Sequence, residues 1–217
     1  MATRFYLPST GTPAITPAFH AGWEQTTAAD RIEMDTVKQS TSFATKADSE
    51  TSSSNTYDVL LRQYISKKRY QAYTFTTSHS FKLQVRCLES NANANFLMRC
   101  RIAVIQNDGT LRGDLETGSI DGTEFDAEAL ENRKDGWTFS SGASMLDGDR
   151  MLIEIGFRAT NTKTTSYTGT MDFGDNSGTD LPEDDTDQNQ YNPWFEISEN
   201  LVEYTPPSAF IPRIIMF

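Results

Sequence analysis

The sequence has 217 residues, of which 37% are hydrophobic and 23% are charged, so it has enough apolar material for one large folded domain and is not typical of a disordered chain. Its formal net charge is −11. This argues against a nucleic-acid partner, since phosphate contacts need clustered Lys and Arg. The sequence has neither a membrane-length apolar run nor the charged-then-apolar start of a signal peptide, so we expect no membrane partner.

The first 56 residues are expected to form an extended arm and a linker. The best helical candidate is 27–38, which has no clean apolar stripe at a period of 3.6 residues. The segment 41–56 is rich in Ser and Thr and is expected to be a loop or linker. Prolines interrupt the apolar residues before it, which prevents a helix or a central strand. We therefore expect the apolar side chains of this arm to contact other subunits; they are Phe5, Tyr6, Leu7, Phe19 and Trp23.

Residues 57–199 are expected to form an all-β domain. Runs with a period of two alternate with clusters of Asn, Asp, Gly and Ser, and they number about eight. This pattern is typical of an antiparallel two-sheet β-sandwich, similar to a jelly roll. The runs are 58–66, 70–77, 81–87, 96–104, 111–115, 150–158, 167–173 and 194–197.

Two cysteines lie in the clearest pair of runs. A hairpin about 90–95 would place Cys87 opposite Cys100 and Val85 opposite Ile102 on the core side. Without a secretion signal, we expect two packed core thiols in preference to a disulfide.

Two further turns are predicted from glycines. Asp108-Gly109 suits a tight hairpin turn between the run that contains Cys100 and the run at 111–115. A second turn, around Gly148, precedes the run at 150–158.

The sequence has no motif of a known catalytic centre. It lacks a nucleophile elbow, a phosphate loop and a dinucleotide fingerprint. Its two histidines, His20 and His79, lack further ligands at a metal-binding spacing. We therefore expect a protein that is not an enzyme and has no resident cofactor.

An acidic segment leaves calcium binding open. Residues 172–187 contain seven carboxylates and no Lys or Arg, and calcium prefers several oxygen ligands from a flexible loop. A charge run is more often a solvated face, and the twelve-residue calcium-loop pattern is absent. The candidate ligands are Asp172, Asp175, Asp180, Asp184 and Asp185.

The aromatic residues leave a second alternative open. Trp137 and Tyr167 lie near expected loop ends, where an aromatic ring is able to stack on a sugar. A tryptophan in such a domain is more often part of the core.

The segment 200–217 is apolar and interrupted by proline. Such a segment is able to lie along the sheet edge of another subunit, adding main-chain hydrogen bonds and burying side chains. The side chains expected to make this subunit contact are Phe210, Ile211, Ile214, Ile215, Met216 and Phe217.

Several stretches resemble a loose family of virion structural proteins of tailed bacteriophages. They are 4–10 (RFYLPST), 17–24 (PAFHAGWE), 59–66 (VLLRQYIS), 86–91 (RCLESN), 148–156 (GDRMLIEIG), 172–175 (DFGD), 180–185 (DLPEDD) and 192–196 (NPWFE). The resemblance implies a β-sandwich building block that is present in many copies on a capsid or tail. It implies no catalytic residues.

Together these features predict a non-enzymatic accessory capsid subunit, of the decoration or cement kind, that braces neighbouring coat proteins. Its expected partners are major capsid or tail proteins and copies of itself in a homo-oligomer. It is expected in the virion, assembled in the host cytoplasm and released by lysis. The alternatives are a tail, neck or host-adhesion component of the virion and a carbohydrate-binding β-sandwich module.

Overall fold

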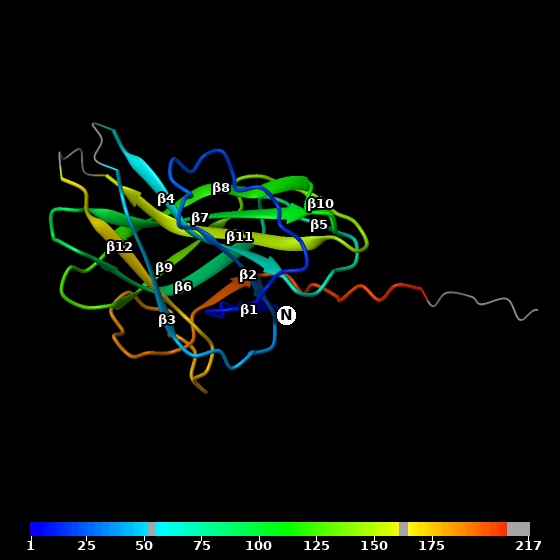
Figure 1. The fold of residues 1–217 in the computed structure, drawn as a ribbon. Coiled ribbons are helices and arrows are strands. Elements are labelled where there is room, and N and C mark those ends of the chain that lie inside the picture. The colour runs from blue at the N-terminus through cyan, green and yellow to red at the C-terminus, as the bar shows by residue number, and fades with distance from the viewer. Residues whose placement is uncertain (52–54, 161–164, 208–217) are drawn as a thin grey trace, which may run out of the picture.

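The computed structural model describes residues 1–51, 55–160 and 165–207 (Figure 1). Thirteen strands are present in these ranges, and they are β1 (Thr3–Tyr6), β2 (Asp30–Met34), β3 (Ala44–Ser49), β4 (Tyr57–Ser66), β5 (Tyr73–Thr74), β6 (Ser80–Glu89), β7 (Phe96–Ile105), β8 (Leu111–Glu124), β9 (Glu131–Thr138), β10 (Ser144–Met145), β11 (Arg150–Ala159), β12 (Thr168–Phe173) and β13 (Trp194–Ile197). The described chain is all-β, as predicted. Throughout these ranges, no helix is long and apolar enough to cross a lipid bilayer.

Two sheets form the body of the molecule. The six-stranded sheet has the order β1-β13-β6-β12-β3, with β9 pairing to the other side of β6, and its pairs are antiparallel. The five-stranded sheet has the order β2-β4-β11-β7-β8, in which β2 runs parallel to β4 and the other pairs are antiparallel. In Figure 1, β4, β11, β7 and β8 lie above β6, β9, β12 and β3.

The core lies between the two sheets. Alternate residues of β6 and β7 point into it, and Leu83, Cys87, Met98 and Cys100 are all fully buried. Such alternation is the sequence signal of a strand with one face on a core.

One glycine marks a close approach of the two sheets. A Cβ atom added to Gly169 of β12 would lie 2.5 Å from the ring of Phe157 on β11. Because interiors are packed to near crystal density, that ring occupies the space that any larger side chain would need.

The predicted hairpin between the two cysteine strands is wrong. β6 and β7 lie in different sheets, so Cys87 and Cys100 are not cross-strand neighbours. The positions predicted to face the core in both runs nevertheless do so, and both thiols are buried and free. Periodicity specifies which face of a strand is buried, but it does not specify which strand is the partner.

Both glycine turns are confirmed. Gly109 and Gly148 have positive φ angles of 93°, which a residue without a Cβ adopts at no steric cost. Gly109 lies in the turn between β7 and β8, with Ile105 opposite Leu111. Strand β8 continues to Glu124, well beyond the expected run at 111–115.

The expectation of a separate arm and linker at 1–56 differs from the structure. β1 pairs with β13, β2 pairs with β4 and β3 pairs with β12, so this segment supplies strands to both sheets. The helical candidate at 27–38 contains β2, and the expected loop at 41–56 contains β3. Short strands with few large apolar residues show little periodicity in the sequence, because pairing with adjacent strands makes them strands.

Candidate functional site

The structure separates the predicted contact residues into two groups. Those of the segment 200–217 from Phe210 onward lie outside the described residues. The predicted contact residues near the N-terminus are among the described residues, and they contact the body of the same chain.

Phe5 and Leu7 are fully buried in the core. The Phe5 ring stacks on Phe195 of β13 at 5.9 Å between centroids and meets Tyr70 edge-on at 6.1 Å. Tyr6 is half-buried, and its hydroxyl donates to the Asp180 carboxylate at 3.2 Å. The expectation that Phe5 and Leu7 contact another subunit is therefore corrected, because they fill the core of their own domain. Tyr6 lies outside this core and is held by Asp180 of the same chain.

Trp23 and Phe19 also pack within the chain. Trp23 is only 6% exposed, and the Arg99 guanidinium lies 4.6 Å from its ring centroid. The Arg31 guanidinium lies 3.8 Å from the ring centroid of Phe19. Cation–π contacts of this kind hold the two rings against the five-stranded sheet.

A buried carboxylate anchors this segment. Glu154 of β11 is fully buried, and its Oε1 accepts hydrogen bonds from the His20 amide at 3.0 Å and from Gln63 Nε2 at 2.9 Å. Its Oε2 accepts from Trp23 Nε1 at 2.9 Å and from Arg101 Nη1 at 3.4 Å. We name these five residues the Glu154 cluster. A buried charge is tolerated where it is paired and fully hydrogen-bonded, as it is in this cluster.

The candidate calcium ligands are not brought together. Within the described residues, no group of three or more His, Cys, Asp or Glu side chains has the geometry to hold a metal ion. The carboxylates instead have separate partners, which are Arg86 for Asp172, the amides of Gln39 and Thr41 for Asp175, Arg4 and Lys38 for Asp180, the amides of Thr186 and Asp187 for Asp184, and Lys134 for Asp185.

The two thiols are held in apolar surroundings. Burial raises the pKa of Cys87 and of Cys100 well above the ordinary thiol value. The Cys100 thiol also donates to Asp135 Oδ2 at 3.3 Å. Since the thiolate is the nucleophile, thiols with raised pKa values are unreactive at neutral pH.

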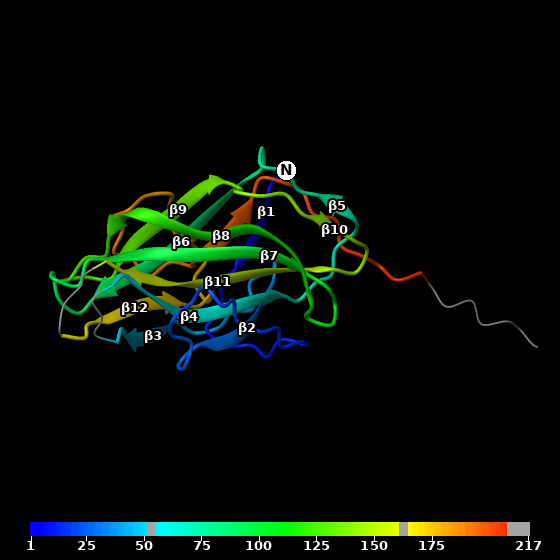
Figure 2. The ribbon, with the colours of Figure 1, turned by 90° about the horizontal axis from the view of Figure 1, so that it is seen from above.

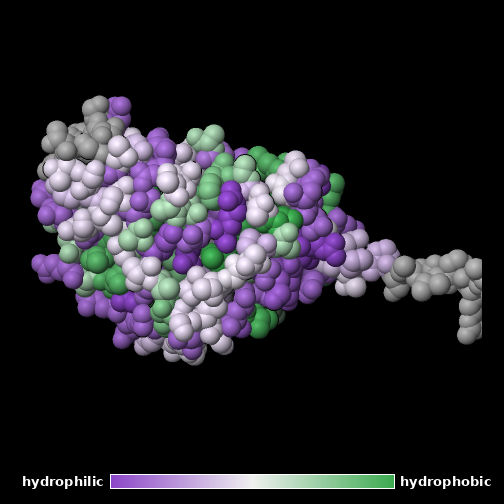
Figure 3. Space-filling model, in the orientation of Figure 1, coloured by the Kyte–Doolittle hydropathy of each residue, from purple (hydrophilic) through white to green (hydrophobic). Residues whose placement is uncertain are grey.

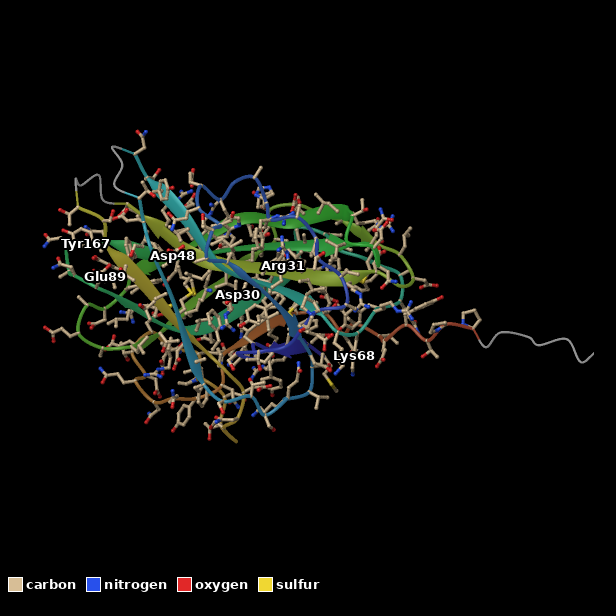
Figure 4. All side chains as sticks on the ribbon, viewed as in Figure 1. Asp30, Arg31, Asp48, Lys68, Glu89 and Tyr167 are labelled. Atoms are coloured by element: carbon tan, nitrogen blue, oxygen red, sulfur yellow. The ribbon has the colours of Figure 1, made fainter. Side chains whose placement is uncertain are left out.

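The chain leaves the sandwich at its described C-terminal end. Leu201 is buried, and the Tyr204 amide donates to the Arg69 carbonyl at 2.8 Å. Lys68, labelled in Figure 4 beside this exit, has its Nζ 3.4 Å from Glu203. The residues that follow, 205–207, are exposed.

The two candidate sugar-stacking residues lie far apart. Trp137 of β9 pairs with Phe81 at the start of β6, whereas Tyr167 precedes β12, whose Gly169 pairs with Glu89 at the end of β6. Glu89 and Tyr167 lie at the same end of the molecule in Figure 4. The strand from Phe81 to Glu89 spans roughly 25 Å, so the two rings belong to different surfaces.

A groove runs beside Trp137. It has a volume of about 560 Å³ and lies between β6, β9 and the middle of β8, with Glu183 at its rim. Strands β8 and β9 contact each other along this flank, which Figure 2 shows from above. Among the lining residues are Lys82, Gln84, Asp121 and Lys134.

These groove residues were not singled out from the sequence. Lys82, Gln84 and Lys134 lie at the outward positions of β6 and β9. The alternation of apolar and polar residues at 81–87 predicts which face of β6 is buried. No local feature of the sequence predicts that β9 lies beside β6.

No protein family matches the sequence, and a search of curated proteins finds no match. Among solved structures, the chain is similar to SACOL2612, a CocE/NonD family hydrolase from Staphylococcus aureus, with a TM-score of 0.45 and 8% identity over 91% of this chain and 36% of that one. It is also similar to a structure of infectious bursal disease virus Gx strain, with a TM-score of 0.24 and 9% identity over 75% of this chain and 37% of that one. The chain spans little more than a third of either, and likenesses this weak carry no conclusion about function.

Proposed function

We propose that this chain is a non-enzymatic structural subunit of a tailed-bacteriophage virion, an accessory capsid protein of the decoration or cement kind. The observation that carries the proposal is the relation between the sandwich and its C-terminal segment. The core of the described chain is filled by residues up to Leu201, the last described residues, 205–207, are exposed, and the sequence that follows, 208–217, is apolar.

Energetics favour a repeated contact for such a segment. Each large apolar side chain of 208–217 contributes about 1.5–3 kcal/mol when it is buried. Ordering the backbone costs about 1–2 kcal/mol per residue. The two nearly cancel for one copy, so stable binding needs many copies acting together, as in a capsid lattice.

The surface of the sandwich is consistent with a solvent-facing role. The face drawn in Figure 3 is mainly hydrophilic, with small scattered hydrophobic areas. The net charge of −11 keeps copies of the domain apart except where a specific contact joins them.

In this proposal the N-terminal segment has a role in the fold and not in assembly. The Glu154 cluster and the core positions of Phe5 and Leu7 hold it in its own domain. The contact to other subunits is therefore assigned to the C-terminal segment alone.

The proposed partners are major capsid or tail proteins and copies of this chain in a homo-oligomer. The protein would be assembled in the host cytoplasm and released in virions by lysis. The proposal requires neither a cofactor nor a catalytic residue.

The test is deletion of residues 208–217. We expect the chain ending at Pro207 to keep the urea unfolding midpoint of the full chain and to be absent from purified particles. The double variant Ile211→Asp and Ile214→Asp should behave in the same way, because a buried unpaired charge is costly. A matched control is Val37→Ser, which removes an exposed apolar side chain (62%) from the body of the domain and should leave incorporation unchanged.

Two results would contradict the proposal. Unfolding of the isolated deletion variant would show that the segment packs in its own domain. Incorporation of the folded deletion variant at the level of the full chain would show that the segment makes no contact to other subunits.

A further inference from the structure

Trp137 differs from the other tryptophans of the chain. Its side chain lies on β9 and is 70% exposed, whereas Trp23 and Trp194 are 6% and 1% exposed. An indole buries more apolar area than almost any other side chain, so leaving it in water forgoes a large stabilisation. An exposed tryptophan on a strand is explained most directly by a ligand that covers it.

The groove beside Trp137 has the size of a ligand site. Its volume of about 560 Å³ falls within the range of small-molecule sites, which is about 300–1,000 Å³. Its walls come from strands of both sheets, which are more rigid than loops and hold polar groups at fixed positions. We name it the Trp137 groove.

The polar side chains of the groove are held in place. Lys82 Nζ lies 2.7 Å from Glu183 Oε2, and Lys134 Nζ lies 3.0 Å from Asp185 Oδ2. Gln84 is 2% exposed, and its Oε1 accepts a hydrogen bond from Asn132 Nδ2 at 2.8 Å.

One groove residue has an acceptor without a partner. Asp121 Oδ2 is buried from solvent and has no hydrogen-bond partner among the described residues. A buried polar atom without a partner costs about 1–3 kcal/mol, and a ligand hydroxyl that donates to it would recover that cost. Burial, and then the nearby Asp185 and Asp135, raise the pKa of Asp121 to about 6.

The charges of the groove select against an anionic ligand. Two lysines line it, Lys82 and Lys134, together with three acids, Asp121, Asp135 and Glu183. Both lysines are already paired with carboxylates, so no unpaired cation is left to bind a sulfate, a phosphate or a sugar acid.

We propose that the Trp137 groove binds a neutral oligosaccharide. The indole of Trp137 stacks on the apolar face of one sugar ring, and Asp121 Oδ2 accepts a hydrogen bond from a sugar hydroxyl. This binding does not involve the C-terminal segment. Its test is therefore separate from the test of the virion proposal.

Two assays test this inference on the full chain. The first is binding to an array of neutral hexose and N-acetylhexosamine oligosaccharides, with oligosaccharides containing uronic and sialic acids as the acidic set. The second is acrylamide quenching of tryptophan fluorescence, titrated with a neutral oligosaccharide retained on the array. Trp137 is the exposed one of the three tryptophans, so it dominates the quenching, and bound sugar should protect it.

We expect the full chain to bind at least one neutral oligosaccharide and to show reduced quenching with it. Trp137→Ala should weaken binding tenfold or more, and Asp121→Asn should weaken it threefold or more. The matched control is Leu146→Ala, an exposed apolar residue (49%) outside the groove, which should bind as the full chain does. Absence of binding to every neutral oligosaccharide, binding to the acidic set alone, or undiminished binding by Trp137→Ala would overturn the inference.

Discussion

The Glu154 cluster gives the sharpest prediction about stability. In Glu154→Gln the side chain keeps its shape but replaces one carboxylate oxygen with an NH₂ group, which donates. Each oxygen of Glu154 accepts two hydrogen bonds, from His20 and Gln63 on one side and from Trp23 and Arg101 on the other. Whichever way the amide turns, two buried donors lose their acceptor.

The expected cost follows from those two donors. Each buried donor left without a partner costs about 1–3 kcal/mol. Arg101 keeps its ion pair with Asp114, which limits the additional loss from the missing charge. We therefore expect Glu154→Gln to lower the free energy of unfolding by about 2–4 kcal/mol, a large fraction of the 5–15 kcal/mol typical of a domain.

Urea unfolding at neutral pH, followed by tryptophan fluorescence, measures this difference. The matched control is Glu183→Gln, whose ion pair with Lys82 has both side chains 49% exposed. Its free energy of unfolding should change by less than about 0.5 kcal/mol, because exposed pairs contribute little. If Glu154→Gln also changed it by less than about 0.5 kcal/mol, the reasoning that this carboxylate holds the N-terminal segment would be refuted.

Three further predictions concern the core and the groove. Neither Cys87 nor Cys100 should react with a thiol reagent in the native chain, and both should react in guanidinium chloride; fast native labelling would contradict their burial. Gly169→Ala should cost about 1–3 kcal/mol in urea unfolding by crowding Phe157, whereas Gly178→Ala, with open space around it, should not; equal costs would contradict the close approach of the sheets. Because the pKa of Asp121 is higher in the folded chain, stability should fall as pH rises from 3.8 through about 6; Asp121→Asn should remove that part of the fall, and an unchanged profile would contradict it.

Some strand positions in the second half of the chain were predictable from the sequence, although β9 (Glu131–Thr138) was not among the expected runs. β11 and β13 follow their expected runs within a residue, since each combines clean alternation with nearby turn residues. The glycine turns were predictable for the same reason, because the backbone at Gly109 requires a residue without a Cβ.

The pairing of strands was not predictable from local signals. β6 and β7 are neighbours in sequence and were predicted to form a hairpin, but they do not pair with each other. β6 pairs with the distant strands β9, β12 and β13, and β7 pairs with the distant β11 as well as with the adjacent β8. Which strands pair is determined by the burial of the apolar faces of whole sheets, and no short stretch of sequence specifies that.

The position of the N-terminal segment was hidden for a related reason. Phe5 and Trp23 read as exposed apolar residues in a proline-rich arm, but Glu154 and Phe195, which hold them, lie more than 130 residues away in the sequence. The Trp137 groove was also missed, because it forms only when β8, β9 and β6 come together.

The most direct test of the proposed function is quantitative mass spectrometry of purified virions of a phage whose genome contains this sequence. An accessory capsid subunit predicts the chain in stoichiometric amounts, at a copy number comparable with that of the major coat protein. A copy number of a few to tens per particle, measured relative to the coat protein in the same spectra, would indicate a component of the tail or neck. Absence of the chain from the particles would contradict the account.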